Sequence, residues 1–358
     1  MVPAFSQLTK NKGKTGSNSV LLLLLCLGLI LLFLLDLHSG SVLIPVKELV
    51  RVLAGGESSN PTWKEIILNL RLPRMITAIF AGSALGLSGL FMQTLFLNPL
   101  AGPFVLGINS GASLGVALVI LLSGLGGFSS FAGGFDLLAE VGMVLSASIG
   151  SVIVIFLILF IARRIASRTV ILIIGIMFGY GVSALVSVLI HFSLAERVQS
   201  FLTWSFGSFS TVSWKELQIM VPLLGITMLL SFPLAKSLNA LLLGETYASS
   251  MGVETRSIRS LVILSAAVLA ATVTAFCGPV AFLGIAIPHL GRNLFRTGDH
   301  RILIPATILL GGILALVADL ATHIPGHGIV LPLNALTSLI GAPVVIWVIA
   351  RYQHVGGK

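Results

Sequence analysis

Long runs of apolar residues, separated by short polar segments, make up most of this chain of 358 residues. The first run, Val20 to Leu37, would form a helix of roughly 27 Å, enough to cross most of a bilayer's hydrocarbon. Backbone polar groups need partners inside lipid, and the runs lack the alternation of barrel strands, so each predicts a helix. We therefore expect an all-α, polytopic membrane protein.

The runs predict ten membrane-spanning helices. They are expected at Val20–Leu37, Met75–Leu97, Val105–Leu122, Val141–Ala162, Val170–Phe192, Leu217–Ala235, Leu261–Phe276, Val280–Leu294, Leu303–Leu320 and Ala335–Ala350. The chain accordingly divides into a cytoplasmic tail at 1–19, a ten-helix membrane domain at 20–351 and a second cytoplasmic tail at 352–358. The membrane domain includes a long inner loop at 236–260.

Composition supports a membrane location and excludes other classes. Only 9% of the residues are charged, whereas soluble domains carry about 25%. The formal net charge is +9, but the basic residues lie between apolar runs and form no single stripe, so we expect no nucleic-acid partner. Two cysteines, Cys26 and Cys277, imply no disulfide framework.

The distribution of charge predicts the orientation. With the N-terminus inside, the inner segments hold fourteen basic and three acidic residues, and the outer segments hold seven basic and nine acidic ones. This asymmetry follows the positive-inside rule and places both termini in the cytoplasm. A cleaved signal peptide is the alternative for the first run, but no small-x-small cleavage site follows it.

Small residues on the second span predict close helix packing. Gly82, Gly86 and Gly89 are three and four residues apart, which places them on one helix face where a neighbouring backbone can approach.

The inner loop carries a candidate partner surface. Gly244 and Gly252 bracket a stretch long enough for two turns of helix outside the bilayer, with apolar and polar residues. Such a helix either binds a partner protein or lies on the lipid surface.

Several short motifs carry a resemblance to a known family. They are Arg71-Leu72-Pro73-Arg74, Asn98-Pro99-Leu100-Ala101, Leu243-Gly244-Glu245 with Met251-Gly252-Val253, Ala281-Phe282-Leu283-Gly284 with Ile287-Pro288-His289, Asp299-His300-Arg301 and Gly341-Ala342-Pro343. In this order, from about residue 20 to residue 351, they resemble the FecCD-type permeases of bacterial ABC importers for iron siderophores, haem and cobalamin.

The resemblance implies a type II importer fold in the bacterial plasma membrane. A second permease subunit, either a copy or a close paralogue, two ABC ATPase subunits and a solute-binding protein are the implied partners, in addition to membrane lipid. The cargo would be a large chelate, a ferric siderophore first, with haem and cobalamin as alternatives. This chain would bind no cofactor and catalyse no reaction, because ATP and Mg²⁺ would lie on the partner ATPases.

The resemblance also assigns roles to particular residues. The segment that seats in the ATPase would comprise Leu243, Gly244, Glu245, Ala248, Met251, Gly252 and Val253. The binding protein would dock through Arg71, Arg74 and His323, for which plain anchoring at the interface is the alternative. The fifth and tenth helices would line the pathway, which would include Gly175, Met177 and Gly179, with an inner gate at Ser167, Arg168 and Thr169.

Metal, enzyme and ion-coupled readings have weaker support. His323 and His327 are four residues apart, a spacing that metals use, but Pro325 and Gly326 disfavour a helix there and no third ligand is evident, so we expect no metal site. An intramembrane enzyme would need a buried Ser/His or metal-binding pair, and none stands out in the sequence. An ion-coupled secondary transporter is the main alternative, and it generally needs an ionisable residue at mid-span, whereas Asp36 and Asp319 lie near helix ends.

Overall fold

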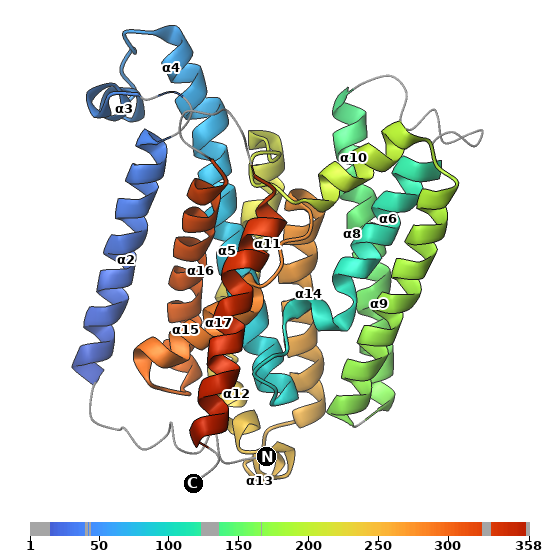
Figure 1. Cartoon of the computed structure of the whole chain (residues 1–358). Helices are drawn as coiled ribbons and strands as arrows, with labels where there is room; N and C mark the ends of the chain where they lie inside the picture. The colour runs from blue at the N-terminus through green and yellow to red at the C-terminus, as the bar shows by residue number, and fades with distance from the viewer. Residues whose placement is uncertain are drawn as a thin grey trace. The chain divides into compact units, whose positions relative to one another are not determined.

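The structure is a computed structural model whose backbone is described for residues 15–39, 42, 44–122, 136–165, 167–323 and 331–355. Every long regular element in this part of the chain is a helix (Figure 1). The chain divides into two compact units. The first comprises residues 1–87, 208–235 and 281–358, and the second comprises residues 88–207 and 236–280.

The first unit contains the helices of both chain ends. They are α2 (Thr15–His38), α3 (Val46–Leu53), α4 (Pro61–Glu65), a π-helical turn (Ile66–Arg71), the first part of α5 (Leu72–Phe96), α11 (Trp214–Ser231), α15 (Leu283–Phe295), α16 (His300–Thr322) and α17 (Leu333–Val355). Helix α16 packs against α2, α15 and α17.

The second unit is built around a short central helix. Its elements are a 3₁₀ turn (Pro103–Leu106), α6 (Ile108–Leu122), α8 (Asp136–Arg164), α9 (Arg168–His191), α10 (Ala195–Ser205), α12 (Ala235–Leu242), α13 (Glu245–Ser250) and α14 (Thr255–Cys277). Helix α6 packs against α8, α9, α10 and α14.

Six described helices are long and apolar enough to cross a membrane. They comprise Ser17–His38, Pro61–Phe96, Gly142–Arg164, Thr169–His191, Thr255–Cys277 and His300–Thr322. The number rises to seven if α11 and α12, which follow one another in the chain, form one broken span. The prediction of an all-helical membrane protein is thus confirmed, but the count of ten helices is not.

Two expected spans form helices that are too short to cross a bilayer as continuous elements. The run from Val280 becomes α15, whose 13 residues reach about 20 Å against a hydrocarbon core of about 30 Å. Left-handed backbone at Phe282 (φ 65°) and Arg296 (φ 49°) ends this helix on both sides. The run from Val105 is likewise divided by Gly107 (φ 73°), which leaves 15 residues in α6.

Glycine allows α5 and α16 to approach closely in the first unit. A Cβ atom on Gly82 would lie 2.1 Å from the carbonyl oxygen of Gly311, and one on Gly86 would lie 3.1 Å from the carbonyl oxygen of Thr307 and 2.7 Å from Ile287 of α15. The Ser83 hydroxyl donates a hydrogen bond of 2.7 Å to the Ile308 carbonyl oxygen across the same contact. The predicted packing role of Gly82 and Gly86 is therefore confirmed.

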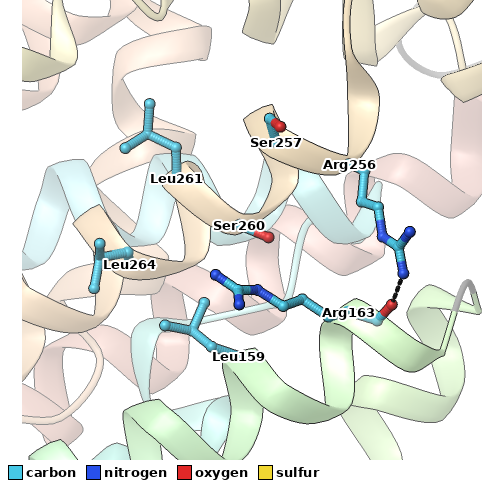
Figure 2. Close-up of a pocket in the computed structure, with 7 residues that line it drawn as sticks. All are labelled: Leu159, Arg163, Arg256, Ser257, Ser260, Leu261 and Leu264. Atoms are coloured by element: carbon cyan, nitrogen blue, oxygen red, sulfur yellow. Dashed lines mark hydrogen bonds between the residues drawn. The ribbon is translucent and has the colours of Figure 1, made fainter.

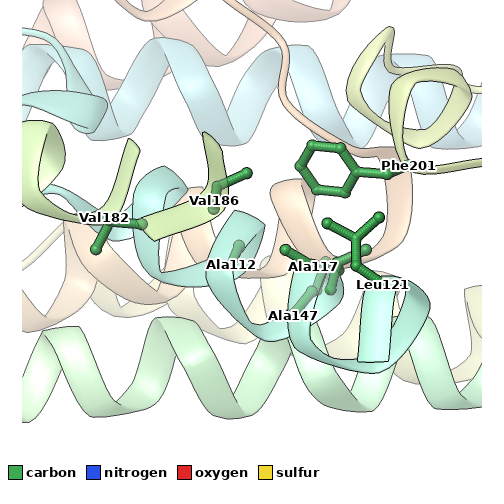
Figure 3. Packing of buried hydrophobic residues seen from close by; sticks show 9 residues of the cluster. Ala112, Ala117, Leu121, Ala147, Val182, Val186 and Phe201 are labelled. Atoms are coloured by element: carbon green, nitrogen blue, oxygen red, sulfur yellow. The ribbon is translucent and has the colours of Figure 1, made fainter. Parts of the chain in front are cut away.

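The core of the second unit uses the same device. Cβ atoms on Gly115 and Gly150 would each lie 2.1 Å from a carbonyl oxygen of the facing helix. Around this contact, Figure 3 shows small and branched side chains of α6, α8 and α9 packed beneath Phe201 of α10. Close backbone approach replaces large side chains as the source of van der Waals contact, as is common in membrane helices.

The Gly82 contact gives a first prediction. Gly82→Ala should lower the unfolding temperature of the detergent-solubilised protein, by a loss of stability of about 1–3 kcal/mol, because the added methyl group meets backbone that cannot move aside. Gly225→Ala on α11 is the matched control, since its Cβ atom would have Phe80 as its nearest neighbour at 4.0 Å. Equal unfolding temperatures for the two variants would contradict this account of the contact.

Candidate functional site

Two glycines with left-handed backbone set the ends of the short helix α13. Gly244 (φ 104°) precedes Glu245–Ser250, and Gly252 (φ 81°) follows it. Positive φ values favour glycine because it lacks a Cβ atom. The segment expected as a loop at 236–260 therefore holds two short helices and the beginning of α14, and the predicted helix between the two glycines is confirmed.

Helix α13 is fixed to its neighbours through one buried side chain. Ala248 is fully buried and forms a small cluster with Ala240 and Leu241 of α12. Val253 packs against this cluster, and its amide donates a hydrogen bond of 3.1 Å to the Ala248 carbonyl oxygen. Ala248 thus positions α13 on α12, and it is not available as a surface contact.

The surface of this segment carries three exposed apolar side chains. Leu243, Tyr247 and Met251 are 56%, 56% and 59% exposed. Tyr247 and Met251 share one side of α13, since the Met251 amide at the C-cap donates a hydrogen bond of 3.1 Å to the Tyr247 carbonyl oxygen, whereas Leu243 lies in the turn before Gly244. Leu243 and Met251 were among the residues expected to couple, whereas Tyr247 was missed, although its spacing of four from both was the available signal.

Arg71 lies inside the first unit, where it serves the end of α2. Its guanidinium donates hydrogen bonds to the carbonyl oxygens of Leu37 (2.6 Å) and His38 (3.3 Å), and also to that of Val42. The last carbonyls of a helix have no partner within the helix. Arg71 satisfies two of them and so closes the end of α2.

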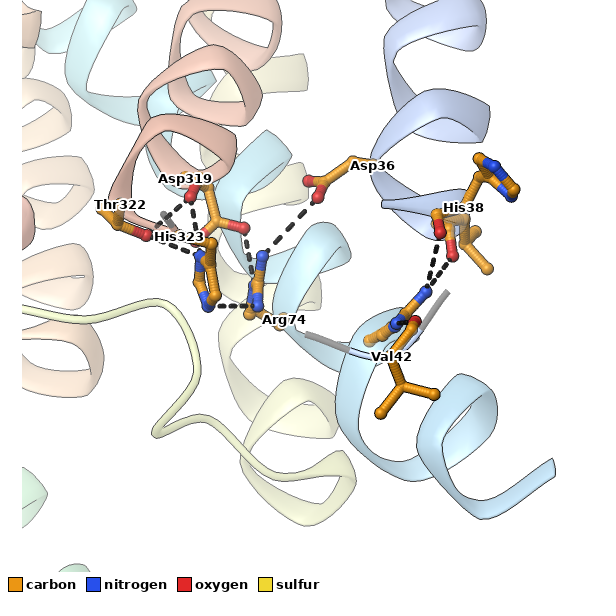
Figure 4. A network of polar contacts seen from close by, with 9 residues as sticks. Asp36, His38, Val42, Arg74, Asp319, Thr322 and His323 are labelled. Atoms are coloured by element: carbon orange, nitrogen blue, oxygen red, sulfur yellow. Dashed lines mark hydrogen bonds and ion pairs between the residues drawn. The ribbon is translucent and has the colours of Figure 1, made fainter. Parts of the chain in front are cut away.

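Arg74 joins three helices through a buried charge network (Figure 4). Its Nε donates to Asp319 Oδ2 of α16 at 2.6 Å, and its Nη2 lies 3.5 Å from Asp36 Oδ1 of α2. Both carboxylates are 3% exposed. Both acids lie near helix ends, as predicted, but their shared partner could not be predicted, since residues 36, 74 and 319 are far apart in the chain.

His323 completes this network at the end of α16. Its Nε2 lies 2.8 Å from Arg74 Nη1, and its Nδ1 lies 2.8 Å from Thr322 Oγ1 and 3.0 Å from the Asp319 carbonyl oxygen. Because arginine is a donor only, Nε2 must accept, and the proton of a neutral imidazole is then on Nδ1. Arg74, Asp36, Asp319 and His323 are below called the Arg74 network.

Outside the spans, Glu48 orders the segment that leads to Arg71. Its carboxylate accepts hydrogen bonds from the amide and hydroxyl of Ser59, at 2.9 and 2.7 Å, and pairs with Arg51. The Ser59 amide, first, and the Ser59 hydroxyl lower the pKa of Glu48 below its ordinary value. A lowered pKa means that these contacts stabilise the fold at neutral pH and are lost only in acid, as the carboxylate is protonated.

The residues expected along a pathway lie on different faces of α9. A Cβ atom on Gly175 would lie 2.3 Å from the Val105 carbonyl oxygen, so this glycine packs against the 3₁₀ turn, and one on Gly179 would lie 3.3 Å from Ser110 Oγ. Met177, in contrast, is 54% exposed. A role in the pathway stays a prediction for all three, and Gly175 has a packing role in addition.

The expected gate lies at the beginning of α9. Ser167 is the N-cap of this helix and accepts a hydrogen bond from the Val170 amide. Ser167 and Thr169 are exposed, and Arg168 is the first helical residue. Gating by these residues stays a prediction.

Among the described residues, no three His, Cys, Asp or Glu side chains are grouped as metal ligands would be. His323 is engaged by Arg74 and Thr322, and His327 lies outside the described residues.

Comparisons with known proteins agree on one family. The model of the FecCD transport family matches residues 28–351. The chain is 32% identical to a protein of Methanocaldococcus jannaschii described as an ABC transporter permease, over 93% of this chain and 96% of the relative. It is 33% identical to the vitamin B12 import system permease protein BtuC of Klebsiella pneumoniae, over 88% of this chain and 93% of the relative.

A solved structure is similar over almost the whole chain. It is described as an inward-facing conformation of an ABC transporter of metal-chelate type, and its TM-score to this chain is 0.78. The two sequences are 28% identical, and the match covers 93% of this chain and 99% of the other.

The Arg74 network gives a second prediction. Arg74→Gln should lower the stability of the purified protein by about 3–5 kcal/mol, because it leaves two buried carboxylates without their cation. The triple variant that adds Asp36→Asn and Asp319→Asn should regain most of this loss. Arg51→Gln, which breaks an ion pair whose arginine side chain is 42% exposed, should change stability by at most about 1 kcal/mol. Unfolding in detergent measures the stability of all three variants. If Arg74→Gln is as stable as Arg51→Gln, the Arg74 network does not stabilise the fold.

Proposed function

Because the chain belongs to the FecCD transport family, we propose that it is the membrane permease subunit of an ATP-driven importer that moves a metal chelate into the cytoplasm. In this proposal residues 20–351 form the membrane domain, and both tails, 1–19 and 352–358, lie in the cytoplasm. A second permease subunit, two ABC ATPases and a solute-binding protein complete the transporter. ATP and Mg²⁺ bind to the ATPases, so this chain itself catalyses nothing.

The exposed apolar face of α13 is the observation that carries this proposal. Tyr247 is exposed on α13, Met251 is exposed at its C-cap, and Leu243 is exposed in the turn before Gly244. Apolar and aromatic side chains that are exposed together favour a protein partner, and they would fill a groove on an ATPase.

The packing of α13 provides a route for mechanical coupling. The Ala248 cluster joins α13 to α12, and Ile258 at the beginning of α14 packs against the same cluster. Helix α14 in turn packs against α6 and α8. A push on α13 by closing ATPases would therefore tilt α14 together with the helices it contacts, which is the kind of small rigid-body motion that opens and closes transport pathways.

Docking of a binding protein at Arg71, Arg74 and His323 is also part of the proposal. Arg71 and Arg74 already hold carbonyl oxygens and carboxylates of their own unit, so an acidic group on the binding protein would compete with them. Such an exchange of charge partners would link docking to the ends of α2 and α16. Complementary charges of this kind act mainly on the rate of encounter and on register.

The cargo is proposed as a large chelate, with a ferric siderophore as the first candidate. The names of the relatives support the class, since one imports vitamin B12 and another is described as of metal-chelate type. Haem and cobalamin are the other members of the class.

The coupling role of α13 gives a third prediction. In proteoliposomes with a cognate ATPase and binding protein, Tyr247→Glu and Met251→Glu should each reduce ATP-driven uptake at least about tenfold, because a charge would enter a desolvated apolar contact. Ser249→Glu is the matched control, since Ser249 is exposed on the same helix about 200° around the axis from Tyr247. If Ser249→Glu and Tyr247→Glu impair uptake equally, or neither does, the exposed apolar face does not seat an ATPase.

The same vesicles give a fourth prediction, which separates the cargoes and the driving force. Uptake of a ferric siderophore should require ATP on the side of the membrane where the ATPases are bound. It should persist without any ion gradient. Uptake of haem or cobalamin alone would change the cargo but keep the importer. Uptake driven by a proton gradient without ATP would instead support the ion-coupled alternative, for which the buried Asp36 and Asp319 would be the carriers.

A further inference from the structure

A groove lies between the end of α8 and the beginning of α14 in the second unit. Its volume is about 470 Å³, within the range of about 300–1,000 Å³ that is usual for small-molecule sites. At one end it is lined by the polar residues Arg256, Ser257 and Ser260, and at the other end by Leu159, Leu261 and Leu264. The Arg163 side chain extends from the first end towards Leu159 (Figure 2). None of these residues belongs to the coupling, docking or gate sets described above.

The polar end is held together by hydrogen bonds between the two helix ends. The guanidinium of Arg256 donates to the Arg163 carbonyl oxygen, and Arg259 donates to the Ala162 carbonyl oxygen at 2.6 Å. These carbonyls end α8 and lack partners within the helix. The groove is thus a fixed feature of the unit, and the Arg163 side chain in Figure 2 extends along it towards Ser260 and Leu159.

The groove is lined by two arginines that form no ion pair among the described residues. Among the described residues the ion pairs join Arg51 to Glu48 and Arg74 to Asp36 and Asp319, and none includes Arg163 or Arg256. The bond from Arg256 to a carbonyl oxygen leaves its charge in place. The first turn of α14 adds amide N–H groups and the positive end of a 23-residue helix. This environment favours an anion with several acceptor oxygens.

The apolar end restricts the kind of anion. Leu261 and Leu264 are 44% and 40% exposed, and they lie on a helix that is apolar enough to cross a membrane. The charge distribution of the sequence puts the beginning of α14 at the inner membrane surface. Two arginines at headgroup level, with leucines leading into the hydrocarbon, match a molecule with an anionic head and an aliphatic tail.

We propose that this groove binds an anionic phospholipid. The phosphate binds to the guanidinium group of Arg163, which is suited to paired hydrogen bonds with phosphate oxygens, and Arg256 adds a second positive charge at the polar end. The hydroxyl groups of Ser257 and Ser260 form hydrogen bonds with the remaining polar atoms of the lipid headgroup. An acyl chain lies along Leu261 and Leu264. Basic pockets between membrane helices at the cytoplasmic side are a known type of lipid site. The binding does not depend on the transport proposal, because it uses residues of this chain alone.

The fifth prediction tests this site by native mass spectrometry of the full chain, titrated with phosphatidylglycerol in detergent. Arg163→Gln should weaken retention of the lipid about fivefold, and Arg256→Gln should weaken it similarly. Arg164→Gln is the matched control. It removes the same charge one residue along α8, but Arg164 stacks over the Phe160 ring at 4.9 Å and does not line the groove. Thermal unfolding of each variant confirms that the fold is retained.

Three further measurements keep the alternatives apart. Phosphatidylcholine, which has the same tails and phosphate but no net charge, should be retained less well, and Arg163→Gln should weaken its retention less than that of phosphatidylglycerol. If inorganic phosphate competes with the lipid and binds alone with the same dependence on Arg163, the groove is a site for a soluble anion, and the lipid proposal fails. The lipid proposal also fails if Arg163→Gln and Arg164→Gln weaken lipid retention equally. It fails as well if Arg163→Gln leaves lipid retention unchanged but abolishes assembly with the ATPase, because the groove would then be a contact with that protein.

Discussion

The lack of water around the spans is the constraint on which the rest of this structure depends. Polar groups that lie within the hydrocarbon need partners within the protein, because lipid tails offer none. Arginine meets this need repeatedly. Arg71 closes the end of α2, Arg256 and Arg259 close the end of α8, and Arg74 neutralises carboxylates from two helices. In each case one planar group with several donors joins helix ends that are distant in sequence.

The same constraint explains what the sequence could predict. Apolar runs and glycine spacing report on the surroundings of each helix, so the membrane class, most helix positions and the close approach at Gly82 were all predictable. The bracketing of α13 by Gly244 and Gly252 was predictable for a similarly local reason, since both glycines adopt φ values that other residues avoid. These features need only neighbours in sequence or on one helix face.

Features that depend on distant contacts were not predictable in this way. Hydropathy counted the run from Val280 as a span, because it does not register the left-handed backbone at Phe282 and Arg296 that limits α15. The motif carrying Arg71 and Arg74 predicted a docking role, which stays a prediction, but it did not indicate that Arg71 is only 8% exposed and bonded to the end of α2. The coupling role of Ala248 also stays a prediction, and its full burial against α12 was not evident from the sequence. In each case contacts with residues distant in the sequence determine where a helix ends or whether a side chain is buried.

The beginning of α14 brings the two proposals for this chain onto one short stretch of helix. Ile258 packs on the cluster that fixes α13, while Arg256, Ser257 and Ser260 line the groove shared with α8. Because these residues lie within five positions of one helix, a molecule that fills the groove would restrain the helix end that α13 is proposed to move. Lipid in the groove and force on α13 would therefore both act on the beginning of α14. Hydrogen bonds from Arg256 and Arg259 to the last carbonyl oxygens of α8 hold this part of α14 in place.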